Sequence, residues 1–144
     1  MAGRKILVAL DTSAVAARGI EHAAGLADAL DAPLLLFCAL DAPVKRGLAE
    51  FAEKEGVTLD DAAGEYLGRV ARDLETQGHT VTYREEESED PAAAIVAFAK
   101  AHDIGMVVMT THGRTGLGRQ LMGSVTEEVL RETTVPVYVV PAKG

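Results

Sequence analysis

Short runs of apolar residues recur along this chain and alternate with longer segments of helical pattern. Four of the runs are predicted to be buried strands: Lys5–Leu10, Pro33–Leu40, Ile104–Met109 and Val135–Val140. A fifth, more polar strand is predicted at Thr80–Arg84. Strands that are apolar along their whole length are typical of a parallel sheet with both faces covered. This pattern therefore favours an α/β fold.

The segments between the strands carry the pattern of the covering helices. Asp90 and Pro91 suit the first two positions of a helix, because Asp caps free backbone N–H groups and Pro fits the first turn. Thr58 followed by Asp61 indicates another helix start. Helices are predicted over four segments: Ser13–Leu30, Pro43–Gly78 with a break at residues 56–58, Asp90–His102, and Ser124–Glu132.

The order βαβαβαβαβ predicts one domain over residues 1–144. Right-handed crossovers favour a doubly wound, flavodoxin-like sheet of five parallel strands in the order 3-2-1-4-5. Ligands of such sheets bind at the carboxyl ends of the strands, where the winding reverses. The crevice is therefore expected between residues 10–13, after the first strand, and residues 110–113, after the fourth.

Composition narrows the classes of partner. The 144 residues carry 14 Lys and Arg against 22 Asp and Glu, a net charge of −8, which disfavours binding to nucleic acid or an anionic membrane. No run approaches the ~18 apolar residues that a membrane span needs. The N-terminus shows no secretory signal. The single cysteine, Cys38, lies in an apolar run, so we expect a reducing, cytoplasmic location.

A glycine-rich segment, Met109–Glu127, joins the fourth strand to the last helix. Glycine lets backbone N–H groups approach a ligand closely, and a helix that begins at Ser124 presents free N–H groups and the positive end of its dipole. Together they predict an anion site suited to phosphate. The segment is no P-loop, because Ser124 stands where that motif has lysine, and it lacks the G-x-G-x-x-G dinucleotide pattern.

The segment resembles the nucleotide-binding loop of the universal stress protein family, G-x2-G-x9-G-(S/T). The match runs from Thr110 through Gly113 to Gly123 and Ser124, and departs from the pattern at Thr110, where the family has glycine. Nearly the whole chain shares the resemblance, including Lys5–Ser13, Glu89–Pro91 and Val135–Val140. It implies a stress-response regulatory protein that binds an adenine nucleotide: ATP, or AMP or ADP, with Mg²⁺.

The resemblance also assigns roles to individual positions. Asp11 corresponds to the residue that meets the adenosine, and Ala9 and Ala39 to apolar positions of the base pocket. Met109 and Thr110 flank the ribose and the triphosphate loop. The motif does not require the loop arginines Arg114 and Arg119, but we expect one of them near the phosphates. The phosphate-contacting positions correspond to Gly113, Gly123, Ser124, Val125 and Thr126.

A homodimer is expected through Val135–Val140. This strand falls at the sheet edge in the proposed order, and an apolar edge invites pairing unless it is covered. Two copies can pair antiparallel about a two-fold axis, as the resemblance also implies.

Several plainer interpretations stay open. Ser124 with Glu127 matches a capping box, and Asp11 suits the cap of a helix that starts near Ser13. The acidic run Glu85–Asp90 is interpreted as a solvated turn rather than a metal site. An alternative function stays open because Thr110 replaces the first glycine of the family pattern. It is a dimeric stress-response interaction protein of the same fold without nucleotide binding.

Catalytic patterns are missing from the sequence. There is no G-x-S-x-G elbow, no Cys/His metal array and no lysine in the glycine-rich loop. Slow ATP hydrolysis is the most we expect, because phosphoryl transfer depends on positioning and charge stabilisation.

Overall fold

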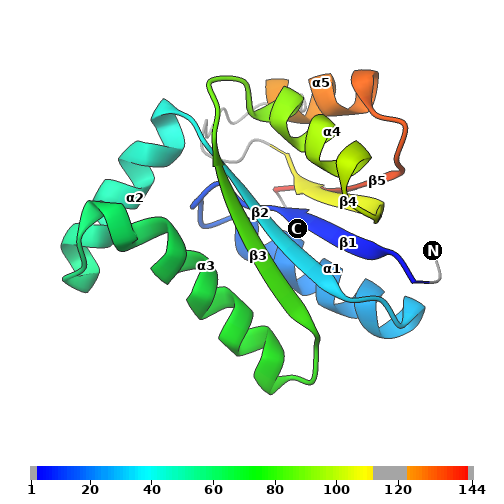
Figure 1. The fold of residues 1–144 in the computed structure, drawn as a ribbon, viewed down its shortest axis with the longest axis horizontal. Helices are drawn as coiled ribbons and strands as arrows, with labels where there is room; N and C mark the ends of the chain where they lie inside the picture. Colours follow the sequence, from blue (N-terminus) through cyan, green and yellow to red (C-terminus); the bar gives the residue numbers. More distant parts are fainter. Residues whose placement is uncertain (1–2, 112–122, 143–144) are drawn as a thin grey trace.

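The computed structural model describes residues 3–111 and 123–142. Its sheet has five parallel strands in the order β3-β2-β1-β4-β5, which confirms the predicted topology (Figure 1). The strands are β1 (Lys5–Ala9), β2 (Leu34–Leu40), β3 (Val81–Glu87), β4 (Ile104–Thr110) and β5 (Val137–Val140). The helices are α1 (Ala16–Leu30), α2 (Ala42–Glu55), α3 (Leu59–Thr76), α4 (Pro91–Ala101) and α5 (Ser124–Glu132).

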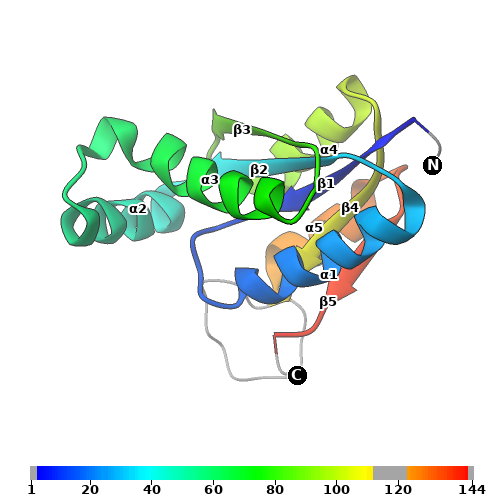
Figure 2. The same ribbon diagram turned by 90° about the horizontal axis from the view of Figure 1, so that it is seen from below.

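Helices cover both faces of the sheet, as the apolar strands predicted. Because successive side chains of a strand point to opposite faces, Ile6 and Val8 belong to the core beneath α1, α2 and α3, and Leu7 belongs to the core beneath α4 and α5. In Figures 1 and 2, α4 and α5 lie together on one side of the sheet and α1 and α3 on the other. The side chains in the middle of β1 and β2 are buried in one or the other of these two cores.

Local sequence signals fix several helix ends. The Asp90 carboxylate accepts a hydrogen bond from the Ala93 backbone N–H at 3.1 Å, and Pro91 follows it as the first residue of α4. Thr58 begins α3 by accepting a hydrogen bond from the Asp61 N–H at 3.2 Å. Gly56 ends α2 with a φ of +70°, the left-handed conformation that glycine adopts readily. The Asp90-Pro91 and Thr58 predictions are confirmed.

Three predicted boundaries need correction. The helix predicted from Ser13 begins at Ala16, because a turn precedes it in which the Ala16 N–H donates to the Ser13 carbonyl at 3.2 Å. β5 begins at Val137 rather than Val135, and Pro136 in between lacks the N–H that a paired strand uses. β3 continues to Glu87, so the first half of the predicted acidic turn is strand. An edge strand tolerates these charges, because its side chains remain exposed.

None of the helices within residues 3–111 and 123–142 is long and apolar enough to cross a membrane.

Candidate functional site

A pocket of about 240 Å³ opens at the carboxyl ends of β1, β2 and β4. This is the topological switch point of the sheet, because β1 connects onward to β2 on one side and pairs with β4 on the other. The first turns of α2, α4 and α5 complete the walls, through Pro43, Pro91 and Ser124 among others. Chain segments far apart in the sequence therefore meet at one place.

One side of the pocket is apolar. Ala9, Phe37, Ala39 and Met109 line it from the strands, and Ile95 lines it from α4. Phe37 is fully buried, and its ring packs against Phe98 with the centroids 4.8 Å apart. Small alanines on the strands leave space that larger side chains would fill. This wall suits a flat apolar ring system.

Asp11 follows β1 at the floor of the pocket. Its Oδ1 accepts hydrogen bonds from the Ser13 backbone N–H, at 3.0 Å, and from the Ser13 hydroxyl. Asp11 does not act as the N-cap of α1: the cap position is Val15, which makes no side-chain cap bond. Thr12 has a φ of +68°, a conformation that is rare for a β-branched residue and occurs most often at functional sites. The turn 11–13 thus orients the Asp11 carboxylate.

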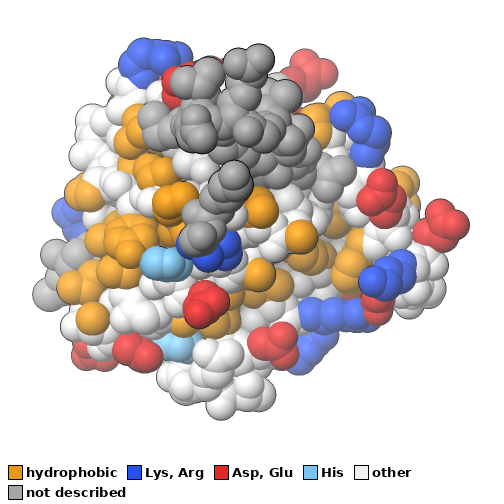
Figure 3. All heavy atoms as spheres, turned by 180° about the vertical axis from the view of Figure 1, so that it is seen from behind, with side chains coloured by type: hydrophobic (Ala, Val, Ile, Leu, Met, Phe, Trp, Pro, Cys, Tyr) orange, Lys and Arg blue, Asp and Glu red, His pale blue; other side chains and the backbone are white. Residues whose placement is uncertain are grey.

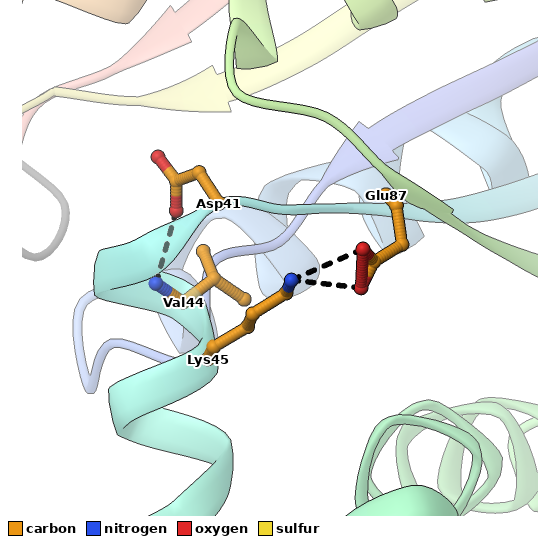
Figure 4. A network of polar contacts seen from close by, with 4 residues as sticks. All are labelled: Asp41, Val44, Lys45 and Glu87. Carbon is orange, nitrogen blue, oxygen red and sulfur yellow. Dashed lines mark hydrogen bonds and ion pairs between the residues drawn. The ribbon is translucent and has the colours of Figure 1, made fainter.

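Asp41 is a second carboxylate at the pocket, at the start of α2. Its Oδ1 accepts a hydrogen bond from the Val44 backbone N–H at 3.0 Å, so it is the N-cap of the helix (Figure 4). One turn further on, Lys45 Nζ lies 2.8 Å and 3.1 Å from the two carboxylate oxygens of Glu87, at the end of β3. The first turn of α2 is therefore attached both to β2 and to the edge strand.

The N-terminus of α5 forms the polar end of the pocket. Gly123 is the N-cap, with an extended backbone, and its carbonyl accepts the Glu127 N–H at 3.1 Å. The backbone N–H groups of the first turn have no partners within the helix, and the positive end of its dipole lies there. Ser124 is the first helical residue, and the α5 cap makes no side-chain bond. The capping-box interpretation of Ser124 is therefore wrong.

Thr110 ends β4 beside this helix. It is paired with Val140 of β5, and it is absent from the residues with positive φ, so its backbone is strand-like. The Thr126 hydroxyl, buried with 2 % exposure, donates to the Thr110 carbonyl at 3.4 Å. β4 and α5 are thus held together at the pocket.

The comparisons with known proteins agree on one family. The model of the Universal stress protein family matches residues 3–141, nearly the whole chain. The chain belongs to the universal stress protein family. It is 32 % identical over 139 residues to Universal stress protein MJ0531 of Methanocaldococcus jannaschii, covering 95 % of this chain and 81 % of that protein.

Solved structures of universal stress proteins and related chains share the fold. The structure of the hypothetical protein MJ0577 of Methanocaldococcus jannaschii superimposes with a TM-score of 0.80 at 27 % identity, covering 98 % of this chain and 97 % of that one. A universal stress protein from Archaeoglobus fulgidus, solved in complex with dAMP, has a TM-score of 0.68 at 23 % identity, with coverage of 96 % and 98 %.

Most residues predicted for the universal stress protein site meet at this pocket. Gly113 and Arg114 lie outside the described residues. Those that line the pocket are Ala9, Asp11, Ala39, Met109, Thr110, Gly123, Ser124, Val125 and Thr126. Leu10 belongs to the predicted crevice segment 10–13, and sequence reasoning missed the lining residues Phe37, Asp41, Pro43, Val44, Pro91 and Ile95. Asp41 had a usable signal, since it follows a buried strand that neighbours β1.

The carboxylates of Asp11 and Asp41 also affect the pKa of the buried Cys38 thiol. Cys38 of β2 is fully buried, on the face that packs against α1, α2 and α3. Burial, followed by the negative charges of Asp11, Glu85 and Asp41, raises the pKa of the Cys38 thiol to about 12. A thiol with this pKa is protonated at neutral pH and is a poor nucleophile. Cys38 is therefore part of the core.

Proposed function

We propose that the pocket binds an adenine nucleotide, ATP or its products ADP and AMP, and that the protein works as a nucleotide-binding regulatory protein of the stress response. The observation that carries the proposal is that one pocket is lined both by an apolar wall and by the N-terminal turn of α5. A nucleotide needs both, because its base is flat and apolar and its phosphates are anionic. The relative solved with dAMP supports the same ligand class.

The order of the strands gives the ligand a direction. Neighbouring strands lie about 4.8 Å apart, so the end of β2 is roughly two strand spacings from the end of β4. The phosphates belong at α5, beside β4, and the base belongs at Ala39 and Phe37 on β2. Asp11 lies between them at the end of β1, where a carboxylate accepts hydrogen bonds from ribose hydroxyls.

Mg²⁺ is proposed to enter with the triphosphate. Asp11 and Asp41 are the charged side chains among the described lining residues, and both are negative. Carboxylates repel phosphates unless a cation lies nearby, and Mg²⁺ is usually held by one or two carboxylates together with substrate phosphates. Asp11, at the end of β1 next to β4, lies nearer the phosphate end than Asp41 and would be the carboxylate that meets such an ion. We therefore expect ATP to bind more tightly with Mg²⁺ than with excess chelator.

We propose binding without fast turnover. The described lining holds backbone donors and two carboxylates, but neither a lysine for a transferring phosphoryl group nor a histidine base. Phosphate release is expected far below the ~10 per second of a median enzyme. Sustained release near that rate, from protein free of contaminating ATPase, would contradict this part of the proposal.

We also propose a homodimer through β5, which the resemblance to the universal stress protein family implies. β5 is an edge strand, and Val137, Tyr138 and Val139 are only half-buried in the single chain. The view from behind shows hydrophobic side chains gathered beside a histidine (Figure 3). His22 of α1 lies at this edge, with its Nδ1 3.0 Å from the Tyr138 hydroxyl. Antiparallel pairing of two β5 strands would cover the apolar edge.

Light scattering at micromolar protein tests the dimer. We expect a mass near twice the 15.1 kDa of one chain. A monomer mass at every concentration would contradict it.

The buried thiol of Cys38 also suits a reducing compartment, so we propose a cytoplasmic location.

Calorimetric titration with Mg²⁺ and ATP tests the nucleotide proposal, with Gly123→Val as the decisive variant. Gly123 has a φ of −63°, which valine adopts, so the fold should survive. The branched side chain would stand between the α5 N-terminus and the phosphates, and binding should be lost. Unchanged ATP affinity in the folded variant would place the phosphates elsewhere.

The second candidate function is a dimeric interaction protein that has lost nucleotide binding. Thr110, in place of the family's glycine, is the feature that favours it. The strand-like backbone of Thr110 weakens this alternative, because threonine is unstrained there. A wild-type protein that binds no nucleotide, while still forming the dimer, would support it.

A further inference from the structure

A close contact joins α1 to the end of β4 beneath the pocket. A Cβ on Gly19 would lie 3.1 Å from the Cγ2 methyl of Thr110. Ordinary contacts between carbon atoms lie at about 3.5–4.0 Å. Gly19 is buried, so the helix packs here against the strand end with no side chain of its own between them. The Thr110 methyl occupies space that a side chain at residue 19 would need.

Thr110 has little freedom to move away from α1. Its backbone is paired with Val140 of β5, and its carbonyl accepts the hydrogen bond from Thr126 of α5. Its side chain is branched at Cβ and therefore stiff about χ1. A methyl added at residue 19 would have to be accommodated either by a shift of α1 or by rotation of the Thr110 side chain. Rotation of the Thr110 side chain changes the pocket, because Thr110 is one of its lining residues, whereas a shift of α1 alone does not, because no residue of α1 lines the pocket.

We propose that Gly19 is a positioning residue of the nucleotide site: by leaving room on α1 for the Thr110 methyl, it keeps the Thr110 side chain out of the ligand's space. The proposal rests on the nucleotide-binding function proposed above. Thr110 stands where the family pattern has glycine, and Gly19 supplies on the helix the room that this larger residue needs. The two residues form a complementary pair across the α1–β4 contact.

Two alanine substitutions on α1 separate this role from helix stability. Gly19→Ala and Gly25→Ala bring the same change in helix propensity, since both lie inside α1. Gly25 is exposed and a Cβ there would meet nothing within 4 Å, so it is the matched control. Calorimetric titration with Mg²⁺ and ATP gives the affinity of each variant. Because a displaced Thr110 side chain would enter the ligand's space, Gly19→Ala should lower ATP affinity by about tenfold, or ~1.4 kcal/mol. Gly25→Ala should leave it unchanged.

Removing the Thr110 methyl should cancel the effect. Thr110→Ser keeps the hydroxyl and deletes Cγ2, the atom that meets residue 19. In the Thr110→Ser background, Gly19→Ala should then change ATP affinity by less than about twofold. The double variant lacks the clashing methyl, so it should fold and bind even where Gly19→Ala alone does not fold.

Three results would overturn the proposal while leaving the nucleotide function standing. The first is equal ATP affinity of Gly19→Ala and Gly25→Ala. The second is a loss of ATP affinity in Gly19→Ala that persists in the Thr110→Ser background. The third is a change in the free energy of unfolding of Gly19→Ala without any change in its ATP affinity. A wild type that binds no ATP would instead refute the proposed function, and this proposal with it.

Discussion

The Asp41 carboxylate joins the end of β2 to the first turn of α2 by accepting the Val44 N–H at 3.0 Å. Both residues line the pocket, and Val44 is buried in the core. A helix cap therefore serves as part of the pocket wall. The stability of α2 and the shape of the proposed base site depend on the same hydrogen bond.

Asp41→Ala should destabilise the protein by about 1 kcal/mol, because removal of an N-cap acceptor typically has this cost. Urea unfolding monitored by circular dichroism gives the value. Asp41→Asn is the control, since asparagine caps helices about as well as aspartate. Equal destabilisation by both variants would show that the negative charge, and not the cap, is what the fold needs.

Two glycines of the α2–α3 region should respond to alanine in opposite directions. Gly64 lies inside α3 with open space where a Cβ would be, so Gly64→Ala should stabilise by up to ~1 kcal/mol. Gly56 ends α2 at a φ of +70°, where an L side chain is strained, so Gly56→Ala should destabilise by about 1 kcal/mol. Denaturant midpoints of the two variants provide the comparison, and a shift in the same direction would be at odds with these backbone conformations.

Cys38 should make the protein less stable in alkaline solution. Its pKa is about 12 in the folded chain against an ordinary value of 9.0, so between these values the folded state holds a proton that the unfolded state has released. The free energy of unfolding therefore falls as pH rises above about 9. Burial also raises the pKa of Tyr66, which acts in the same direction.

Cys38→Ala is the control for the alkaline prediction, since it removes the titrating thiol. Its unfolding free energy should depend less steeply on pH above 9 than that of the wild type.

The folded wild type should also resist thiol reagents at neutral pH, because Cys38 has no exposed surface. Rapid labelling under native conditions would contradict the buried placement.

Thr110→Gly should change ATP affinity by less than about tenfold, or ~1.4 kcal/mol. The strand-like backbone suits threonine, so the substitution relieves no strain. Titration of the variant beside the wild type gives the ratio. Tight binding gained by this one change, from a wild type that binds no ATP, would show that Thr110 had closed the site.

The sheet could be predicted from the sequence because its signals are local and repeated. Apolar runs such as Leu34–Leu40 identify buried parallel strands, and the chain order with right-handed crossovers leaves few arrangements. The Asp90 cap and the break at Gly56 also follow from single residues. The switch-point rule located the pocket from the strand order, whereas the individual site residues came from the resemblance to the universal stress protein motif.

The missed features depend on tertiary contacts. The extension of β3 to Glu87 is set by pairing with Leu40 of β2, which outweighs the low strand propensity of glutamate. The Ser124–Glu127 pattern suggested a cap one residue too late, since the backbone places Gly123 there. The contact between Gly19 and Thr110 joins residues 91 positions apart in sequence, and nothing in the chain near Gly19 signals it.

The most direct test of the nucleotide proposal is a two-dimensional ¹H–¹⁵N NMR titration with Mg²⁺ and ATP, because it reports where the ligand binds as well as whether it binds. The amides of Ser124, Val125 and Thr126 should shift at the phosphate end, and those of Ala39 and Asp41 at the base end, with a common affinity. An unperturbed spectrum at millimolar ATP, or shifts confined to residues away from the pocket, would contradict the account.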